Sequence, residues 1–239
     1  MTATVRYRRA LLKLSGEALL GDKPFGIDDA VTDRLAGEVE AVLGLGVKVG
    51  LVLGGGNIFR GMSIAAEGGN RVAGDQMGML ATVMNAIAFE QKLAGRGLKT
   101  RLFSAVPIPT FCETFTQRAA QAAYDAGEAV LFAGGIGSPF VTTDTGAAMR
   151  AAEMGADGLF KATMVDGIYT ADPKRDPSAT RYDHLTFGEA IGKGLKVMDI
   201  AAMALARDSG IPIIVFNIHQ PGAFIDIVKG GGRATVVAG

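Results

Sequence analysis

The sequence offers very little thiol and imidazole chemistry. Its 239 residues include one cysteine, Cys112, two histidines, His184 and His219, and no tryptophan. A single cysteine excludes an intrachain disulfide, and together with the lack of a signal peptide it favours a reducing compartment. Zinc sites draw on cysteine and histidine, and no H-E-x-x-H pattern occurs, so a dedicated zinc site is not expected.

Excess charge and long apolar runs are also missing. Lys plus Arg and Asp plus Glu each number 24, so the formal net charge is zero. Nucleic-acid binders gain most of their affinity from an excess of Lys and Arg, so we expect no nucleic-acid partner. Lys13 interrupts the first apolar run, and no run approaches the ~20 residues that a membrane span needs. We therefore expect a cytoplasmic protein with no membrane partner.

Several nucleotide-binding motifs are missing as well. The sequence has no G-x-x-x-x-G-K-[ST] phosphate loop and no H-R-D or D-F-G pair. Two partial matches to G-x-G-x-x-G fail at the last position, which Phe59 and Phe140 occupy. These absences exclude the P-loop kinases and the protein kinases, and they disfavour a dinucleotide-binding fold.

Short apolar runs do alternate with amphipathic segments along the chain. Hydrophobic residues make up 49% of the sequence and glycines number 34, which suits a sizeable core with many tight loops. The apolar runs have the length and β-branched character of buried strands, and they are 10–14, 47–53, 99–104, 129–133, 158–161, 211–216 and 234–237. Helical spacing of apolar residues or helix-cap signals mark the segments 28–44, 72–93, 115–126, 145–154, 200–209 and 221–228.

This alternation predicts an α/β fold. Strands separated by helices indicate βαβ crossovers, and these give a mainly parallel central sheet between two layers of helices, a three-layer α-β-α sandwich. We expect residues 1–239 to form a single domain, with ligands at the carboxyl ends of the strands. The polar segment 170–185 interrupts the pattern; it is either a lid or a solvated connection.

Two lysines stand at the ends of predicted strands. Lys13 precedes Ser15 and Gly16, and Lys161 ends the run 158–161. A lysine in an apolar strand is costly to bury unless it is paired. Lys13 is therefore either a phosphate ligand or a lysine on a sheet edge that discourages aggregation. Lys161 is poorly explained by a plain strand followed by a turn at Asp166 and Gly167.

Glycine-rich turns follow two other predicted strands. Gly54, Gly55 and Gly56 come after the run 47–53 and precede Arg60. Successive glycines let a ligand approach the backbone, and an arginine suits bidentate phosphate contact, so this turn favours anion binding over a flexible connection.

The second glycine-rich segment, 133–144, runs into a helix. Thr142, Thr143 and Asp144 stand at N-cap positions. A Gly-lined loop at a helix N-terminus also suits a phosphate. Asp199 opens another helix, and we interpret it first as an N-cap.

Two lysines at strand ends, an arginine after a glycine triplet and carboxylates at helix starts form one set. Phosphoryl transfer spreads negative charge over the phosphoryl oxygens, and its catalysis is mostly positioning plus positive charge. The set therefore indicates phosphoryl transfer.

At these residues the sequence resembles the bacterial UMP kinases of the amino-acid-kinase fold family. The resemblance runs from Arg9 to Val237. It rests on KLSGEAL at 13–19, GGGNIFRG at 54–61, GDQMGMLAT at 74–82, KATMVDG at 161–167 and KVMD at 196–199. It implies transfer of the γ-phosphoryl group of ATP to UMP, with Mg²⁺ arriving on ATP and no metal held by the protein alone.

The resemblance also implies roles for individual residues. It implies that the ATP phosphates and the adenine nucleotide are held by Lys13, Leu14, Ser15, Gly16, Gly56, Arg60, Thr163, Tyr169 and Asp172. It implies that UMP is held by Gly55, Asp75, Ile136, Gly137, Ser138, Pro139, Phe140, Val141, Thr142 and Thr143. For catalysis, it implies that Lys161 neutralises the transferring charge, Asp144 orients the lysines, Asp199 assists, and Arg60 bridges donor and acceptor phosphates.

Assembly and regulation are implied in the same way. Family members are homohexamers, built as a trimer of dimers, and those of Gram-negative type are activated by GTP and inhibited by UTP. The GTP-responsive loop corresponds to Gly21, Asp22, Lys23, Pro24, Phe25 and Gly26. Many relatives have Thr and Asn where this chain has Ile136 and Ser138, so we expect weakened UTP inhibition.

Other functions remain as alternatives. A kinase of the same fold that acts on a carboxylate shares the Lys13 and Gly-triplet features, but is not expected to carry the stretches 74–82 and 196–199. An oxometalate storage protein resembles these kinases, and the retained set of charged residues argues against it. A role in pyrimidine gene expression gains no support from a net charge of zero.

Overall fold

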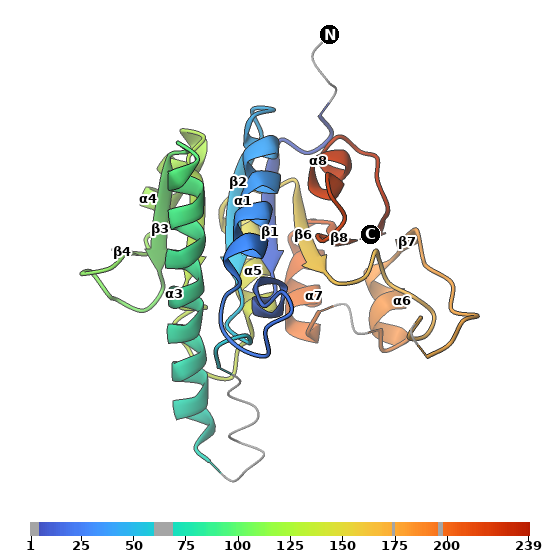
Figure 1. Ribbon diagram of the computed structural model, residues 1–239. Coiled ribbons are helices and arrows are strands. Elements are labelled where there is room, and N and C mark those ends of the chain that lie inside the picture. Colours follow the sequence, from blue (N-terminus) through green and yellow to red (C-terminus); the bar gives the residue numbers. More distant parts are fainter. Residues whose placement is uncertain (1–4, 60–68, 174, 196–197) are drawn as a thin grey trace.

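The computed structural model describes residues 5–59, 69–173, 175–195 and 198–239. A nine-stranded sheet, with the order β4-β3-β5-β2-β1-β6-β8-β9-β7, forms its centre (Figure 1). The strands are β1 (Arg9–Leu14), β2 (Lys48–Leu53), β3 (Thr100–Ser104), β4 (Glu113–Thr114), β5 (Ala129–Ala133), β6 (Gly158–Thr163), β7 (His184–Leu185), β8 (Ile213–Asn217) and β9 (Ala234–Val237). The helices are η1 (Gly16–Leu19), α1 (Asp29–Leu43), α3 (Arg71–Gly95), α4 (Gln117–Asp125), α5 (Thr143–Glu153), α6 (Phe187–Gly192), α7 (Ile200–Asp208) and α8 (Ala223–Val228).

Most strand pairs are parallel, as the alternating pattern predicts. β1 lies at the middle of the sheet and pairs with β2 on one side and β6 on the other, both parallel. Only the β8–β9 pair is antiparallel among the described strand pairs, so β9 and its parallel neighbour β7 run against the rest. The carboxyl ends of β1, β2, β5, β6 and β8 therefore meet at one edge of the sheet.

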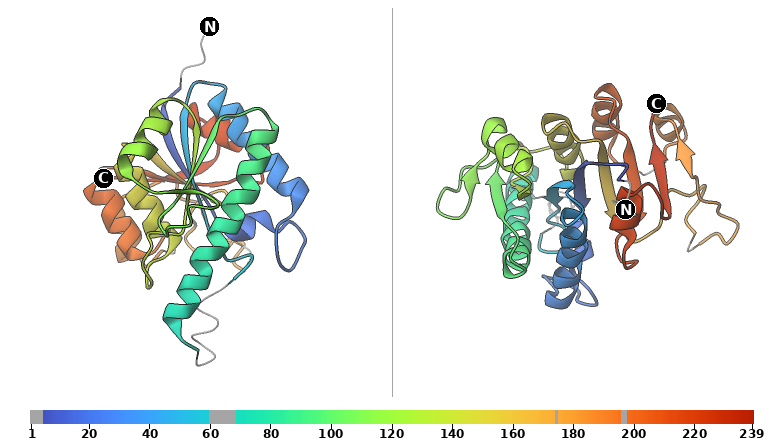
Figure 2. Two further views of the ribbon diagram at one scale, coloured as in Figure 1. Left: turned by 90° about the vertical axis from the view of Figure 1, so that its left-hand side faces the viewer. Right: turned by 90° about the horizontal axis from the view of Figure 1, so that it is seen from above.

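Helices cover both faces of the sheet. One face packs on α1, α3 and α8 through one apolar cluster, and the other packs on α4, α5, α6 and α7 through a second. Figure 2, seen from above, shows these two layers on either side of the strands. The predicted three-layer α/β fold is confirmed.

The longest helix, α3, reaches past the sheet. Asn70 caps it by accepting hydrogen bonds from the N–H groups of Val72 and Ala73. Its N-terminal turns extend beyond the strands at their carboxyl edge (Figures 1 and 2). This extension carries the GDQMGMLAT stretch to the place where ligands of parallel sheets bind.

Four short elements were not expected from the sequence. They are η1, β4, β7 and α6, each of two to six residues. Elements of this length show no full period of apolar residues, so periodicity does not reveal them. The predicted helix 115–126 begins instead at Gln117, because Thr116 is its N-cap and accepts from the N–H of Ala119.

The polar segment 170–185 is partly ordered into the sheet. Tyr169 and Arg181 form an isolated bridge, and the segment ends in β7, which pairs with β9. It is therefore a loop that returns to the sheet. Among the described residues, no helix combines the length and apolar character of a membrane span.

Gly50 on β2 gives a test of packing between the layers. A Cβ at this position would lie 2.8 Å from Leu11 Cδ1 and 3.2 Å from Phe132 Cε2. Gly50→Ala should therefore lower the free energy of unfolding by roughly 1–3 kcal/mol, the usual effect of overpacking. Urea denaturation measures this change.

The matched control is Gly95→Ala at the end of α3, where an added Cβ meets nothing within 4 Å. This variant should be neutral or more stable by up to about 1 kcal/mol, because alanine favours a helix. Equal stability of the two variants would contradict the packing described for Gly50.

Candidate active site

Lys13, Lys161 and Asp144 form a buried charge cluster at the carboxyl edge of the sheet. Lys13 on β1 and Lys161 on β6 are direct neighbours in the parallel register. Asp144 lies in the first turn of α5, with its Oδ1 2.6 Å from Lys13 Nζ and its Oδ2 2.9 Å from Lys161 Nζ. Because β1 is the central strand, the sheet-edge interpretation of Lys13 is wrong.

Burial and the neighbouring opposite charges shift the pKa values of this cluster in opposite directions. Burial raises the pKa of Asp144, but the Lys13 and Lys161 ammonium groups outweigh it and hold that pKa below its ordinary value. Burial lowers the pKa of Lys161, an effect that Asp144 opposes and Lys13 reinforces. One carboxylate shared by two ammonium groups leaves a net positive charge, and this charge suits a phosphate.

Asp199 joins the starts of two helices beside this cluster. It caps α7 by accepting from the N–H of Ala202 at 2.8 Å, so the predicted N-cap is confirmed. The same carboxylate accepts from the hydroxyl groups of Thr142 and Thr145 at the start of α5. Thr142 is itself the N-cap of α5 and accepts from the N–H of Asp144. Asp199 thereby fixes the turn that carries Asp144.

The two turns that follow β1 and β2 are in direct contact. The N–H of Gly54 donates to the carbonyl of Leu14 at 2.8 Å. A Cβ on Gly16 would lie 2.8 Å from Gly56 N and 2.9 Å from Gly54 O. Only glycine therefore fits at position 16 without displacing the triple-glycine turn.

Three cavities follow one another along this edge. The first, about 500 Å³, lies among residues after β6 and includes Thr163, Tyr169 and Asp172. The second, about 230 Å³, shares Lys161 and Thr163 with the first and adds Lys13 and Ser15.

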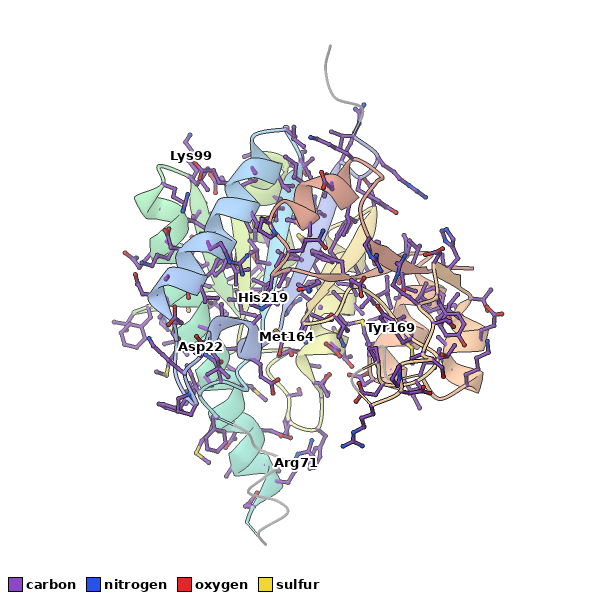
Figure 3. The ribbon with its side chains drawn as sticks, turned by 45° about the vertical axis from the view of Figure 1, so that its right-hand side comes forward. Asp22, Arg71, Lys99, Met164, Tyr169 and His219 are labelled. Carbon is purple, nitrogen blue, oxygen red and sulfur yellow. The ribbon has the colours of Figure 1, made fainter. Side chains whose placement is uncertain are left out.

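The third cavity, about 410 Å³, shares Glu17 with the second and opens between α3 and the segment 135–143. Figure 3 shows Arg71 at the outer end of α3, away from Met164 and Tyr169, which mark the first two cavities. The charge cluster thus lies between two larger hollows.

Asp75 is the carboxylate of the third cavity. Arg71 Nε lies 2.9 Å from both of its oxygens, and the N–H of Phe140 donates to Oδ2 at 2.8 Å. Burial raises the pKa of Asp75, but these hydrogen bonds and the charge of Arg71 bring it below its ordinary value. Asp75 is therefore an ionised acceptor, suited to hydroxyl groups of a ligand.

Most of the residues predicted to hold UMP line this third cavity, and some do not. Its lining includes Gly55, Gly56, Asp75, Ser138, Val141, Thr142 and Thr143. The lining does not include Ile136, Gly137, Pro139 and Phe140. Ile136 faces α5, where its Cγ2 lies 3.6 Å from the Cβ position of Gly146. Phe140 contributes its backbone N–H to Asp75, and its exposed ring lies under the Arg71 guanidinium.

Apart from Gly56, which lines the third cavity, the predicted ATP residues that line a cavity divide between the first two. Lys13 and Ser15 line the second, and Tyr169 and Asp172 line the first. The Tyr169 hydroxyl donates to Asp166 Oδ1 at 2.6 Å, which fixes its ring at the cavity wall. Leu14 and Gly16 lie at the end of β1 and the start of η1, beside the second cavity.

Two predictions fall on residues outside the described part. Arg60 and the Lys196–Val197 portion of the KVMD stretch are not among the described residues. The loop Gly21, Asp22, Lys23, Pro24, Phe25 and Gly26 is described. It joins η1 to α1, and Lys23 Nζ donates to the carbonyl of Ile27.

Sequence reasoning missed three polar residues around the site. Arg71 lies at i,i+4 spacing to Asp75, a signal that the sequence offered. Thr145 supports Asp199, and Thr82 accepts from the N–H of Gly134 at 2.8 Å. Thr82 ends the GDQMGMLAT stretch that carries the resemblance, but no role was predicted for it; Thr145 has no sequence signal that separates it from an ordinary helix residue.

The described residues contain no cluster of three or more His, Cys, Asp and Glu that could hold a metal ion. Asp144 is already shared by two lysines.

Asp144→Asn tests the shared carboxylate. It leaves two buried ammonium groups without their counter-charge, so the free energy of unfolding at pH 7 should fall by roughly 3–5 kcal/mol. The pKa of Asp144 is depressed in the folded state, so its stabilising effect is full above the ordinary pKa and is lost as the pH falls towards the folded value.

Chemical denaturation between pH 2.5 and pH 7 measures both effects. The difference between wild type and Asp144→Asn should shrink below about pH 4. Asp208→Asn, at an exposed carboxylate on α7, is the control and should change stability by less than about 0.5 kcal/mol. A constant difference across this range would contradict an ionised Asp144.

Comparison with known proteins agrees with this geometry. The profile of the amino acid kinase family matches residues 8–217. A uridylate kinase of Agrobacterium fabrum is 58% identical over 99% of this chain and 98% of its own length. A uridylate kinase of Mesorhizobium japonicum is 56% identical over 100% of this chain and 99% of its own length.

A solved structure agrees as well. The UMP kinase of Bacillus anthracis superposes with a TM-score of 0.93 at 36% identity, over 97% of this chain and 96% of that one. The chain therefore belongs to the amino acid kinase family, and the relatives described above are uridylate kinases.

Proposed function

We propose that this chain is a UMP kinase, which transfers the γ-phosphoryl group of Mg·ATP to UMP and releases UDP and ADP. One observation carries the proposal: a buried pair of lysines, held by one carboxylate, lies in a small cavity that joins two larger ones. A reaction between two nucleotides needs two binding sites with positive charge where their phosphates meet. The full-length likeness to uridylate kinases supports the same reaction.

In this reaction the protein has two main roles, to position the two nucleotides and to stabilise negative charge. An oxygen of the UMP phosphate attacks the γ-phosphorus, and the bond from that phosphorus to the β–γ bridging oxygen breaks. The second pKa of a phosphate monoester is about 6, so the nucleophile is largely ionised at pH 7 and needs no general base. Lys13 and Lys161 would stabilise the negative charge on the phosphoryl oxygens, and Asp144 would keep both ammonium groups in place.

The three cavities suggest where each nucleotide lies. The adenine nucleotide would occupy the first cavity, beside Thr163, Tyr169 and Asp172. The ATP phosphates would lie in the second, against the turn of Lys13, Leu14, Ser15 and Gly16 and beside Gly56. UMP would take the third, with its ribose hydroxyls on Asp75 and its phosphate near Gly55.

The segment 136–143 would enclose UMP in two ways. Ser138, Val141, Thr142 and Thr143 line the cavity, whereas Ile136, Gly137, Pro139 and Phe140 would shape the loop. Asp199 would act by positioning α5, and Arg60 would bridge the two phosphate groups.

Further features of the family complete the proposal. They are Mg²⁺ delivered on ATP, a homohexamer built as a trimer of dimers, activation by GTP at Gly21–Gly26, weakened inhibition by UTP and a cytoplasmic location. We also propose that residues 1–239 form a single domain, since one continuous sheet includes all strands from β1 to β9. Analytical ultracentrifugation tests the hexamer, and GTP and UTP dose series test the regulation.

The alternative functions fit less well. A carboxylate kinase of this fold needs an acceptor site for a small acid, whereas the acceptor cavity here is about 410 Å³ and presents the Asp75 carboxylate. The retained set of charged residues and the full-length likeness to uridylate kinases argue against an oxometalate store.

The acceptor specificity is the direct test of the proposal. With Mg·ATP in a coupled assay for ADP, UMP should give turnover well above that with CMP, dUMP or no acceptor. The discrimination against dUMP follows from Asp75, because dUMP lacks a ribose hydroxyl and would leave this partly buried carboxylate without that hydrogen-bond donor, which weakens binding. Turnover with a small carboxylate and none with UMP would contradict the proposal.

The role of the lysines and of Arg60 has its own test. Lys13→Ala should lower kcat at least ~100-fold, the effect of removing one group that stabilises transition-state charge. Arg60→Ala should do the same. Lys229→Ala, at an exposed lysine after α8, is the control and should keep full activity. A near-normal kcat for Lys13→Ala, with folding confirmed by circular dichroism, would remove Lys13 from the mechanism.

A further inference from the structure

Two buried asparagines meet next to the glycine turns of the site. Asn57 follows the triple-glycine turn and is 3% exposed, and Asn85 lies in the middle of α3 and is 0% exposed. Asn57 Nδ2 donates to Asn85 Oδ1 at 3.0 Å, and Asn85 Nδ2 donates back to Asn57 Oδ1 at 2.7 Å. Each side-chain amide therefore donates one hydrogen bond to the other and accepts one from it.

The remaining N–H groups of this pair hold two loops. Asn85 Nδ2 donates to the carbonyl of Gly54 at 2.6 Å, and Asn57 Nδ2 donates to the carbonyl of Gly26 at 2.9 Å. All four side-chain N–H groups therefore have acceptors within the set of Asn57, Asn85, Gly54 and Gly26. A fully satisfied buried network of this kind is rigid, and an unpaired member of it is costly.

Asn57 also ties its own backbone to the loop before α1. Its carbonyl accepts from the N–H of Gly26 at 3.0 Å, so Asn57 and Gly26 are joined by two hydrogen bonds. Gly26 ends the loop in which Figure 3 labels Asp22. The Asn57 side chain further lies against the Cα of Gly16, because a Cβ there would overlap Asn57 Oδ1.

We propose that Asn57 and Asn85 are a positioning pair for phosphoryl transfer. The pair holds the turn after β1, the triple-glycine turn after β2 and the loop 21–26 in one arrangement against α3. Neither side chain lines any of the three cavities, so both act through the turns that they hold. The proposal rests on the proposed kinase function, since the two turns are those assigned to the ATP and UMP phosphates.

The contacts around the two asparagines indicate which kinetic constant changes when their hydrogen bonds are lost. The donor and acceptor turns touch each other through Gly16, Gly54 and Gly56, and Asn85 anchors that contact to a helix of 25 residues. Shifts of about 1 Å between reacting groups lower a rate up to ~100-fold while each ligand still binds. The defect should therefore appear in kcat and not in KM.

The kinetic test compares Asn85→Ala, Asn57→Ala and the double variant. Asn85→Ala should lower kcat by ~tenfold to ~100-fold, with KM for ATP and for UMP each within about threefold of wild type. The double variant should lose no more kcat than the more affected single variant, because residues of one network are not additive. Additive losses, or full kcat in Asn85→Ala, would overturn the proposal.

A matched control separates positioning from general stability. Phe89→Leu removes packing from the same helix at a buried residue of the apolar cluster, four residues beyond Asn85. It should lose thermal stability and keep kcat within about twofold. If Asn85→Ala does not fold, Asn85→Ser keeps a small polar side chain at this position and should still lower kcat, because its shorter side chain loses the pairing with Asn57; wild-type kcat in that variant would count against the proposal.

Hydrogen exchange followed by mass spectrometry tests the pair without any turnover. In Asn85→Ala, peptides that cover 14–28 and 53–59 should exchange faster, and peptides from β5 and α7 should not change. Faster exchange confined to α3 would overturn the proposal. Absence of UMP-dependent activity in the wild-type chain would count against the proposed function alone, because the exchange result does not depend on it.

Discussion

The shared carboxylate of Asp144 is the interaction on which the site depends. Two lysines on adjacent central strands place two positive charges in a nearly buried position, and this is tolerated only because one carboxylate lies between them. That carboxylate reaches both lysines from the first turn of α5. The sheet register, the crossover that starts α5 and the cap of Thr142 are therefore all conditions for the same ion cluster.

The Lys13–Lys161–Asp144 cluster is connected to neighbouring segments on both sides along the edge of the sheet. On one side, Asp199 ties the starts of α5 and α7 together and keeps Asp144 in place. On the other, the turns after β1 and β2 are in contact, and the third cavity lies beside the one that Lys13 lines. Hydrogen bonds of Asn57 and Asn85 connect these turns to α3 and to the loop before α1. Charge stabilisation and positioning, the two demands of phosphoryl transfer, thus come from connected parts of the fold.

Much of this arrangement could be predicted from the sequence. The seven longer strands, the parallel sheet and the position of the lysines at strand ends follow from apolar runs and from the rule that ligands gather at carboxyl ends. The sequence left Lys13 open between a phosphate ligand and a sheet-edge lysine, because strand order depends on contacts far apart in the chain. The central place of β1 resolves that choice.

Other features had no local signal. Asn85 looks like an ordinary polar residue of an amphipathic helix, and its partner is 28 residues away. Ile136 and Phe140 belong to a stretch that resembles a binding loop, yet their side chains face α5 and Arg71. The direction in which a side chain points from a loop depends on φ and ψ along the whole turn. Phe140 has a φ of +66°, which a phenylalanine rarely adopts.

We propose that ATP and UMP meet at the Lys13–Lys161–Asp144 cluster. A crystal structure of the chain with UMP and a non-hydrolysable Mg·ATP analogue tests this directly. We expect the γ-phosphate within hydrogen-bond distance of Lys13 and Lys161, the UMP ribose on Asp75, and the UMP phosphate in line with the γ-phosphorus. Nucleotides bound away from the two lysines, or a γ-phosphate that points away from UMP, would contradict it.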